Sequence, residues 1–339
     1  MLARKLALLL NEKLPGKRVY FVYTHKNGYD RFHHGLRANT EISYWSFHAL
    51  KKAFPRVTFL RFQGEKKERI EKIQSSDVVI GHMGPTMLEA SRRTKKIISF
   101  APFVGHEDHC ISKGPHCSNM EEEMAAYERA AALIFLTSEY NKREYIENNR
   151  NFWYPFLQKL KKPLRIVHQP VDLKTFKRIK TDYKTSHFLY IGHFGHMKGV
   201  EMSRKLVKEV GRTLHIFGSE DRRFDNLDIE QVRVLPQMAD FFIQPGMWEG
   251  QCVAILEAAA RGFIPVVSPE TGYPYDHPYL LRYDDYDYNL ATLKKLLATS
   301  AEERKELGDF LYQKLTEDEQ HNTWKKLTDV LVEEVTSLF

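Results

Sequence analysis

The sequence is poor in cysteine and contains no long apolar run. Its 339 residues include three cysteines, Cys110, Cys117 and Cys252, and so small and odd a number excludes the disulfide framework of a small secreted protein. No apolar segment reaches the roughly 20 residues that a membrane-spanning helix needs. No internal repeat or low-complexity segment is evident, which excludes solenoids and compositionally biased chains. We therefore expect a globular protein in a reducing compartment, the cytoplasm.

What the sequence does contain is the composition of an ordinary globular protein with a basic excess. Apolar residues make up 42% and charged residues 28%, and the length is comfortable for two domains. The net charge of +7 favours an anionic partner, which leaves a phosphorylated small molecule, an acidic glycan, a membrane surface and nucleic acid as classes. No RNA-binding or DNA-binding motif appears, so we expect no nucleic-acid partner.

The segment from Trp248 to Val267 carries the clearest pattern in the chain. The residues before it, Phe241 to Gln244, are typical of a short buried strand. Cys252 to Arg261 holds good helix formers without glycine or proline, and Gly262 follows as a helix-ending glycine. Phe263 to Val267 predicts another strand. In such a strand–helix–strand unit the helix begins at the carboxyl edge of a parallel sheet, where ligands bind.

We predict a phosphate site at the start of that helix. The backbone N–H groups of Gly250, Gln251 and Cys252 are expected to be free, and their partial positive charge suits a phosphate. Glu249 opens the turn, and Glu257 is expected two turns into the helix, roughly 10 Å further along. An anion site flanked by two carboxylates fits a sugar nucleotide, with amides for the diphosphate and carboxylates for hydroxyl groups. The alternative is an amphipathic helix with two exposed acids.

The paired acids Glu249 and Glu257, seven residues between them, and the Gly-x-Pro-Val-Val after the helix resemble the signature of the retaining glycosyltransferases of family 4. That family has the GT-B fold, an α/β architecture of two Rossmann-like domains facing across a cleft. The resemblance implies a hexosyltransferase-like enzyme of carbohydrate biosynthesis that moves a sugar from a nucleotide-sugar donor to a glycan, lipid or other acceptor. It also implies retention of anomeric configuration, contact of Glu249 with the donor sugar, and binding of the ribose hydroxyls by Glu257.

The segment Gly192 to Gly199 resembles the diphosphate-binding loop of the same family. There an arginine and a lysine five positions apart neutralise the departing diphosphate. Lys198 matches the lysine, whereas His193 stands at the arginine position. A histidine is a weaker cation, so leaving-group stabilisation is expected to be weaker or pH-dependent, and a solvated surface lysine is the alternative for Lys198. Because protein cations and a helix end then take the role that Mg²⁺ has elsewhere, we expect no metal and no other cofactor.

Over the first domain the resemblance is only a pattern of strands with a histidine-bearing cleft. Gly28 lies in the loop after the first strand, which helps to bind the acceptor in the family, and His82 closes a later strand at the cleft. The loop 102–117 is rich in His and Cys. In it His106 is the candidate for a catalytic contact with the donor sugar, and His109 is a candidate for the cleft. A metal site is one alternative, although the spacings match no common zinc pattern, and an acceptor loop without chemistry is another.

We predict a boundary between domains near residue 170. Residues 1–170 form the acceptor-side domain, with the C-terminal helix 322–339 packing back onto it, and residues 171–321 form the nucleotide-sugar-binding domain. The expected partners are a nucleotide-sugar donor and a glycan or lipid-linked acceptor. The basic, apolar segment Met1 to Leu10 also offers peripheral contact with an anionic membrane, with a helix packed on the first domain as the alternative.

Two other functions stay open at this point. A sugar-nucleotide epimerase or a sugar-phosphate-using synthase on the same fold would keep the phosphate site, and only a transferase would need an acceptor to consume its donor. A catalytically degenerate glycan-binding module is the other possibility, and His193 together with the short segment 219–237 favours it.

Overall fold

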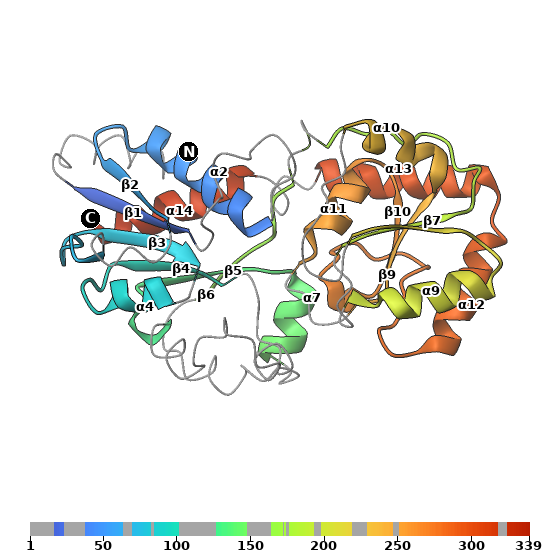
Figure 1. Cartoon of the computed structure of the whole chain (residues 1–339), viewed down its shortest axis with the longest axis horizontal. Helices are drawn as coiled ribbons and strands as arrows, with labels where there is room; N and C mark the ends of the chain where they lie inside the picture. Colours follow the sequence, from blue (N-terminus) through green and yellow to red (C-terminus); the bar gives the residue numbers. More distant parts are fainter. Residues whose placement is uncertain are drawn as a thin grey trace. The chain divides into compact units, whose positions relative to one another are not determined.

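A computed structural model shows two α/β units, each organised on one parallel sheet (Figure 1). Unit 1 comprises Met1–Thr137, Lys142–His168 and Trp324–Phe339, and unit 2 comprises Ser138–Asn141 and Gln169–Thr323. The structure describes residues 17–23, 38–63, 70–82, 85–101, 127–147, 164–171, 173, 176–192, 198–218, 229–246, 251–317 and 324–339. Within these ranges no helix combines the length and the apolar character that crossing a bilayer requires.

The sheet of unit 1 has six parallel strands in the order β2-β1-β3-β4-β5-β6. Their bounds are β1 Arg18–Tyr23, β2 Thr58–Gln63, β3 Val78–His82, β4 Ile97–Ala101, β5 Ala132–Leu136 and β6 Leu164–Val167. The central strands are apolar runs that are fully buried, as a parallel sheet covered on both faces requires. In the register Val79 pairs with Ile97, and Ile98 pairs with Ala132.

Among its described residues, unit 1 also contains the helices α2 (Ala38–Ala53), α4 (Pro85–Ser91) and α14 (Trp324–Leu338) and the π-helical turn η1 (Lys142–Glu147). The apolar positions of α14 recur at helical spacing and pack into the same core as α2 and the strands. Arg165 on β6 holds α14 from outside, with its Nη2 2.6 Å from Glu333 and its Nε 2.7 Å from Glu334. The last helix of the chain therefore belongs to unit 1.

The sheet of unit 2 has four parallel strands in the order β10-β9-β7-β8. Their bounds are β7 Phe188–Ile191, β8 Leu214–Phe217, β9 Phe241–Gln244 and β10 Ile264–Val267. The helices of this unit are α7 Glu139–Asn141, α9 Val200–Glu209, α10 Ile229–Met238, α11 Val253–Ala260, η3 Pro269–Thr271, α12 Tyr286–Leu297 and α13 Ala301–Glu317. Strands β9 and β10 are buried at every position, and aliphatic residues from α11 and α13 share their core.

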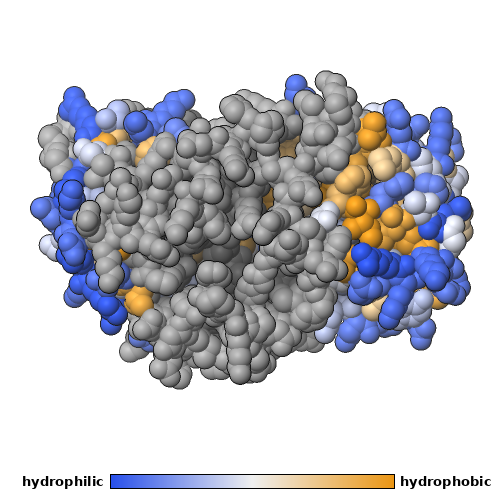
Figure 2. Space-filling view, viewed as in Figure 1, coloured by the Kyte–Doolittle hydropathy of each residue, from blue (hydrophilic) through white to orange (hydrophobic). Residues whose placement is uncertain are grey.

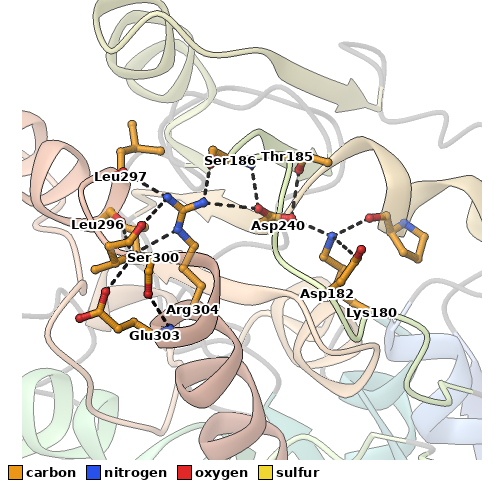
Figure 3. Close-up of polar contacts among 12 residues, drawn as sticks. Lys180, Asp182, Thr185, Ser186, Asp240, Leu296, Leu297, Ser300, Glu303 and Arg304 are labelled. Carbon is orange, nitrogen blue, oxygen red and sulfur yellow. Dashed lines mark hydrogen bonds and ion pairs between the residues drawn. The ribbon is translucent and has the colours of Figure 1, made fainter.

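A buried group of charges lies before β9, at the amino end of this sheet (Figure 3). The side chains of Lys180 and Asp240 are both fully buried and pair at 2.7 Å, and Arg304 from α13 lies 3.8 Å from the same carboxylate. Thr185 Oγ1 and the Ser186 N–H donate to Asp240 at 3.0 and 2.7 Å. Charges this deeply buried persist only when they are paired and hydrogen-bonded. The group therefore ties the segment before β7 to β9 and α13.

Candidate functional site

The strand order of unit 2 reverses beside β7. Strand β8 pairs with one side of β7, and β9, which follows β8 in the chain, pairs with the other side. At such a switch point the loops after the two strands diverge and leave a crevice at the carboxyl edge, where open α/β sheets bind ligands. The loop after β7 leads to Lys198, and the loop after β9 leads to Gln251 and Cys252. The topology thus brings two separately predicted segments to one edge.

Gly199 allows these two loops to approach each other closely. It is the N-cap of α9 with φ 67°, in the left-handed region that favours glycine. A Cβ added there would lie 2.3 Å from the carbonyl oxygen of Pro245 at the end of β9, closer than any side chain tolerates. The N–H and Oγ of Ser203 both donate to the Gly199 carbonyl at 2.9 Å. Backbone geometry and packing therefore both require glycine here, and together they place Lys198 next to the end of β9.

Lys198 is partly buried and interacts electrostatically with Cys252 from the other loop. Burial lowers the pKa of the Lys198 ammonium, and the neighbouring Cys252 thiol acts in the opposite direction. A desolvated ammonium is stabilised by a nearby anion, which would restore its charged form. The two predicted donor-binding residues are therefore close in space, in a setting that favours a negatively charged ligand.

Helix α11 begins one residue later than the pattern predicted, at Val253, with Cys252 as its N-cap. The prediction that the Cys252 amide is free is wrong, because its N–H donates to the carbonyl of Thr271 in η3 at 2.9 Å. The prediction that Glu257 lies two turns into the helix is also wrong. Glu257 lies one turn in, about 6 Å along the axis from Val253. The N–H groups of the first turn, Val253 and Ala254 among them, have no acceptor within the helix and are the donors that this end can offer.

The side chain of Gln251 is buried and has an internal role. Its Oε1 accepts the backbone N–H of Gln169, the first residue of unit 2 after the crossover from unit 1. Only its backbone is therefore a candidate for ligand binding. Sequence patterns did not indicate this link, because the two residues are far apart in the chain.

Gln244 is a polar residue of this edge that the sequence reasoning passed over. It closes β9, is 1% exposed, and its Oε1 accepts from Cys252 Sγ at 3.6 Å. Its Nε2 has no hydrogen-bond partner among the residues that the structure describes. An amide at the end of an otherwise apolar strand was the available signal, since buried polar groups normally have partners.

Glu257 lies on a partly exposed face of α11, one turn before Arg261. Burial lowers the pKa of the Arg261 guanidinium, and the charge of Glu257 opposes that shift. The guanidinium also stacks over the ring of Phe176, 4.4 Å from its centroid. The predicted binding of ribose hydroxyls by Glu257 stays a prediction.

Several predicted site residues lie outside the described residues: Gly28, His106, His109, His193, Glu249 and Gly250. Of His82 the backbone is described, and it closes β3. In unit 1 the strand order reverses between β1 and β3, so His82 ends a strand beside the second switch point of the molecule. Among the described residues no group of three or more His, Cys, Asp or Glu could hold a metal ion, and the loop 102–117 lies outside these residues.

No protein-family model matches the sequence, and no curated protein matches it. Solved structures match the fold over nearly the whole chain. Sucrose-phosphate synthase from Thermosynechococcus elongatus has a TM-score of 0.66 at 12% identity, covering 95% of this chain and 98% of that one. HepE from Anabaena, in complex with UDP and glucose, has a TM-score of 0.62 at 9% identity, with 94% and 99% covered.

A third match, TarM, has a TM-score of 0.54 at 13% identity, and this chain covers only 55% of its length. These neighbours are GT-B glycosyltransferases, so the chain has the GT-B fold, and the predicted α/β architecture is confirmed. At such low identity the likeness establishes the fold, and the chemistry has to be argued from the residues.

Proposed function

We propose that the protein is a nucleotide-sugar-dependent glycosyltransferase, which transfers a sugar to a glycan or lipid acceptor with retention of anomeric configuration. The observation that carries this proposal is the close approach of Gly199 to Pro245, which puts Lys198 beside the end of β9 at the switch point of the unit 2 sheet. A GT-B neighbour captured with UDP and glucose supports the same ligand class.

In this proposal the donor diphosphate lies between Lys198 and the first-turn amides of α11. When the bond between the anomeric carbon and the leaving phosphate oxygen breaks, its electron pair goes to the diphosphate. The Lys198 ammonium and the positive end of the helix dipole stabilise that charge, with His193 as a further donor. These groups replace a divalent metal, so we propose a metal-independent reaction. The acceptor hydroxyl oxygen then forms the new bond to the anomeric carbon on the same face of the sugar, and its proton passes to the departing diphosphate.

The remaining predicted residues complete the site. Glu249 orients the sugar ring, and Glu257 holds the ribose hydroxyls of the donor. On the acceptor side we assign His106 to the donor sugar, and Gly28, His82 and His109 to the acceptor region. Because the sugar carries several hydroxyl groups, carboxylates suit both ends of the donor.

The diphosphate site is tested by calorimetric titration with UDP, GDP and ADP. Lys198→Ala is expected to weaken binding of the preferred nucleotide at least about tenfold, since a hydrogen bond to a charged group contributes about 1.5–3 kcal/mol. The matched control is Lys205→Ala, which removes an exposed lysine of α9 and should leave the affinity unchanged. Equal affinities of the Lys198 and Lys205 variants would refute the proposed site.

The separate roles proposed for Glu249 and Glu257 are tested by measuring sugar transfer and nucleoside diphosphate binding in variants of each. Glu249→Ala should abolish sugar transfer and keep nucleoside diphosphate binding, whereas Glu257→Ala should weaken binding itself. Release of diphosphate from the donor should require an acceptor. Conversion of the donor without an acceptor would favour the epimerase or the synthase, and binding of glycans without any turnover would favour the degenerate module.

A further inference from the structure

The loops before the strands of unit 1 carry a concentration of positive charge. Because the strands are parallel, these loops lie together at one edge of the sheet, which we call the amino edge and define as residues 17–18, 51–57, 70–77, 89–96 and 127–131. It holds eleven basic and only four acidic residues, namely Lys17, Arg18, Lys51, Lys52, Arg56, Lys72, Arg92, Arg93, Lys95, Lys96 and Arg129 against Glu71, Asp77, Glu89 and Glu128. The excess is as large as the net charge of the whole chain, +7.

The loops of the amino edge that precede β1, β3 and β4 are hydrogen-bonded to one another. Arg18 Nη2 donates to the Lys72 carbonyl at 3.3 Å, and Arg93 Nη1 donates to the Glu71 carbonyl at 3.3 Å. Thr94 Oγ1 donates to the Asp77 carbonyl at 2.9 Å. Figure 2 shows hydrophilic residues along the left end of unit 1, where Figure 1 places the starts of its strands.

Two of the four acids of the amino edge are already committed. Asp77 is 2% exposed and accepts from Arg18 Nε and Nη2 at 3.0 and 2.8 Å. Glu89 pairs with Arg92 at 2.8 Å. The other two acids, Glu71 and Glu128, are outnumbered by the nine remaining cations of the amino edge. The crowding of like charges disfavours the charged form of Lys96, because burial, followed by the charge of Lys17, lowers the pKa of its ammonium group.

Stabilisation of helix ends explains only part of this charge. Cations are favoured in the last turn of a helix, where the dipole is negative, and Lys51 and Lys52 occupy that turn of α2. Lys17 and Arg56 lie outside any helix, and Lys96 lies beyond the end of α4. The folded chain alone gains little from placing these like charges together, so a partner with the opposite charge is the simpler explanation.

We propose that the amino edge is a docking surface for an anionic lipid bilayer. The loops before five adjacent strands form a row about 20 Å wide, at about 4.8 Å per strand, which suits a planar array of charges. Within these ranges Pro55 is the only exposed residue that is neither charged nor polar, so the surface offers no aromatic platform for nucleic-acid bases and no apolar wedge. Juxtaposed lysines and arginines are what an anionic leaflet attracts.

The experiment is cosedimentation of the full chain with phosphatidylcholine vesicles that contain or lack phosphatidylglycerol. Binding should require phosphatidylglycerol and disappear at high salt, because the screening length falls from about 10 Å at 0.1 M to about 3 Å at 1 M. The test variant is Arg56→Glu/Lys72→Glu/Lys95→Glu, which changes three exposed cations of the amino edge. At about fivefold per charge lost, its partitioning should weaken by about 100-fold or more.

The matched control is Lys205→Glu/Lys208→Glu/Arg212→Glu, an identical charge change on exposed positions of α9 and the turn after it. The control should keep most of its binding, and both variants should keep the circular dichroism spectrum and the cooperative urea transition of the unmodified protein, which shows that they are folded. If both variants lost vesicle binding equally, binding would depend on the net charge of the protein and not on the amino edge, which would overturn the proposal. The proposal would also be overturned if the unmodified protein did not bind anionic vesicles at low salt. It would likewise be overturned if the unmodified protein bound double-stranded RNA in place of the vesicles and the triple variant lost that RNA binding. None of these results depends on whether sugar transfer occurs.

Discussion

At the scale of single residues, two neighbours in the loop after β7 have separate roles. Lys198 carries the positive charge. Gly199 lets its loop pack closely against Pro245, which puts that charge beside the end of β9. The approach depends on the missing side chain, since the Pro245 carbonyl occupies the space that a Cβ would need. The position of the charge is therefore as sensitive to Gly199 as to Lys198.

We predict that Gly199→Ala weakens nucleoside diphosphate binding and lowers the free energy of unfolding by more than the about 1–2 kcal/mol that a left-handed alanine costs by itself. The control is Gly211→Ala, because Gly211 has φ +64° and a Cβ there meets nothing within 4 Å. That variant should show only the backbone cost and should bind nucleotide normally. Urea denaturation and calorimetry measure both quantities, and equal destabilisation of the two variants would contradict the role of the Pro245 contact.

At the scale of elements, the two ends of the unit 2 sheet differ in chemistry. The carboxyl edge holds Lys198, whose pKa is lowered by burial, and the buried Gln244, whose Nε2 has no hydrogen-bond partner among the described residues. At the amino end the buried carboxylate of Asp240 has its partners in place. It forms ion pairs with Lys180 and Arg304 and accepts hydrogen bonds from Thr185 and Ser186. We interpret the first as prepared for a ligand and the second as structural.

The structural role predicts a large effect of Asp240→Asn. The substitution removes the buried counter-charge of Lys180 and leaves only the exposed Asp182 at 3.6 Å, and breaking a buried ion pair costs about 3–5 kcal/mol of unfolding free energy. The control is Asp309→Asn, which removes the partly exposed partner of Arg178 and should cost at most about 1 kcal/mol. Urea denaturation compares the two, and a loss for Asp240→Asn no larger than that of the control would show that the buried pair contributes little.

At the scale of the whole molecule, one buried histidine makes stability depend on pH. His277 is 7% exposed in the segment that follows η3, and burial lowers its pKa to about 4, against the opposing effects of the Pro265 carbonyl and Asp276. The unfolded chain binds a proton at about pH 6.5, before the folded chain does. The contribution of the neutral His277 to the free energy of unfolding is therefore fully present above about pH 6.5 and is lost as the pH falls toward about 4.

We predict that this loss amounts to about 3 kcal/mol, from about 1.36 kcal/mol per pKa unit. Urea denaturation across this pH range measures it in the unmodified protein, and the same series with His277→Phe removes the titrating group. The difference between the two free energies of unfolding should shift by about 3 kcal/mol in favour of His277→Phe as the pH falls from about 6.5 to about 4. Parallel curves would show that His277 does not titrate differently in the folded chain.

The sequence by itself determined the elements around the candidate site and the fold class. The apolar runs at β9 and β10, the helix formers before Gly262 and the glycine-rich turn after β7 are local patterns, and local patterns decide which segments become strands and helices. The same patterns placed the start of α11 within one residue of its position.

Only the tertiary structure decided which of these elements meet. Lys198 reaches the start of α11 because β9 pairs with β7 on the side away from β8, and the Cys252 amide is engaged because η3 returns to it. The partners of Gln251 and Gln244, and the row of cations at the amino edge, likewise come from segments far apart in the chain. Strand order and loop contacts depend on long-range packing, which no local pattern encodes.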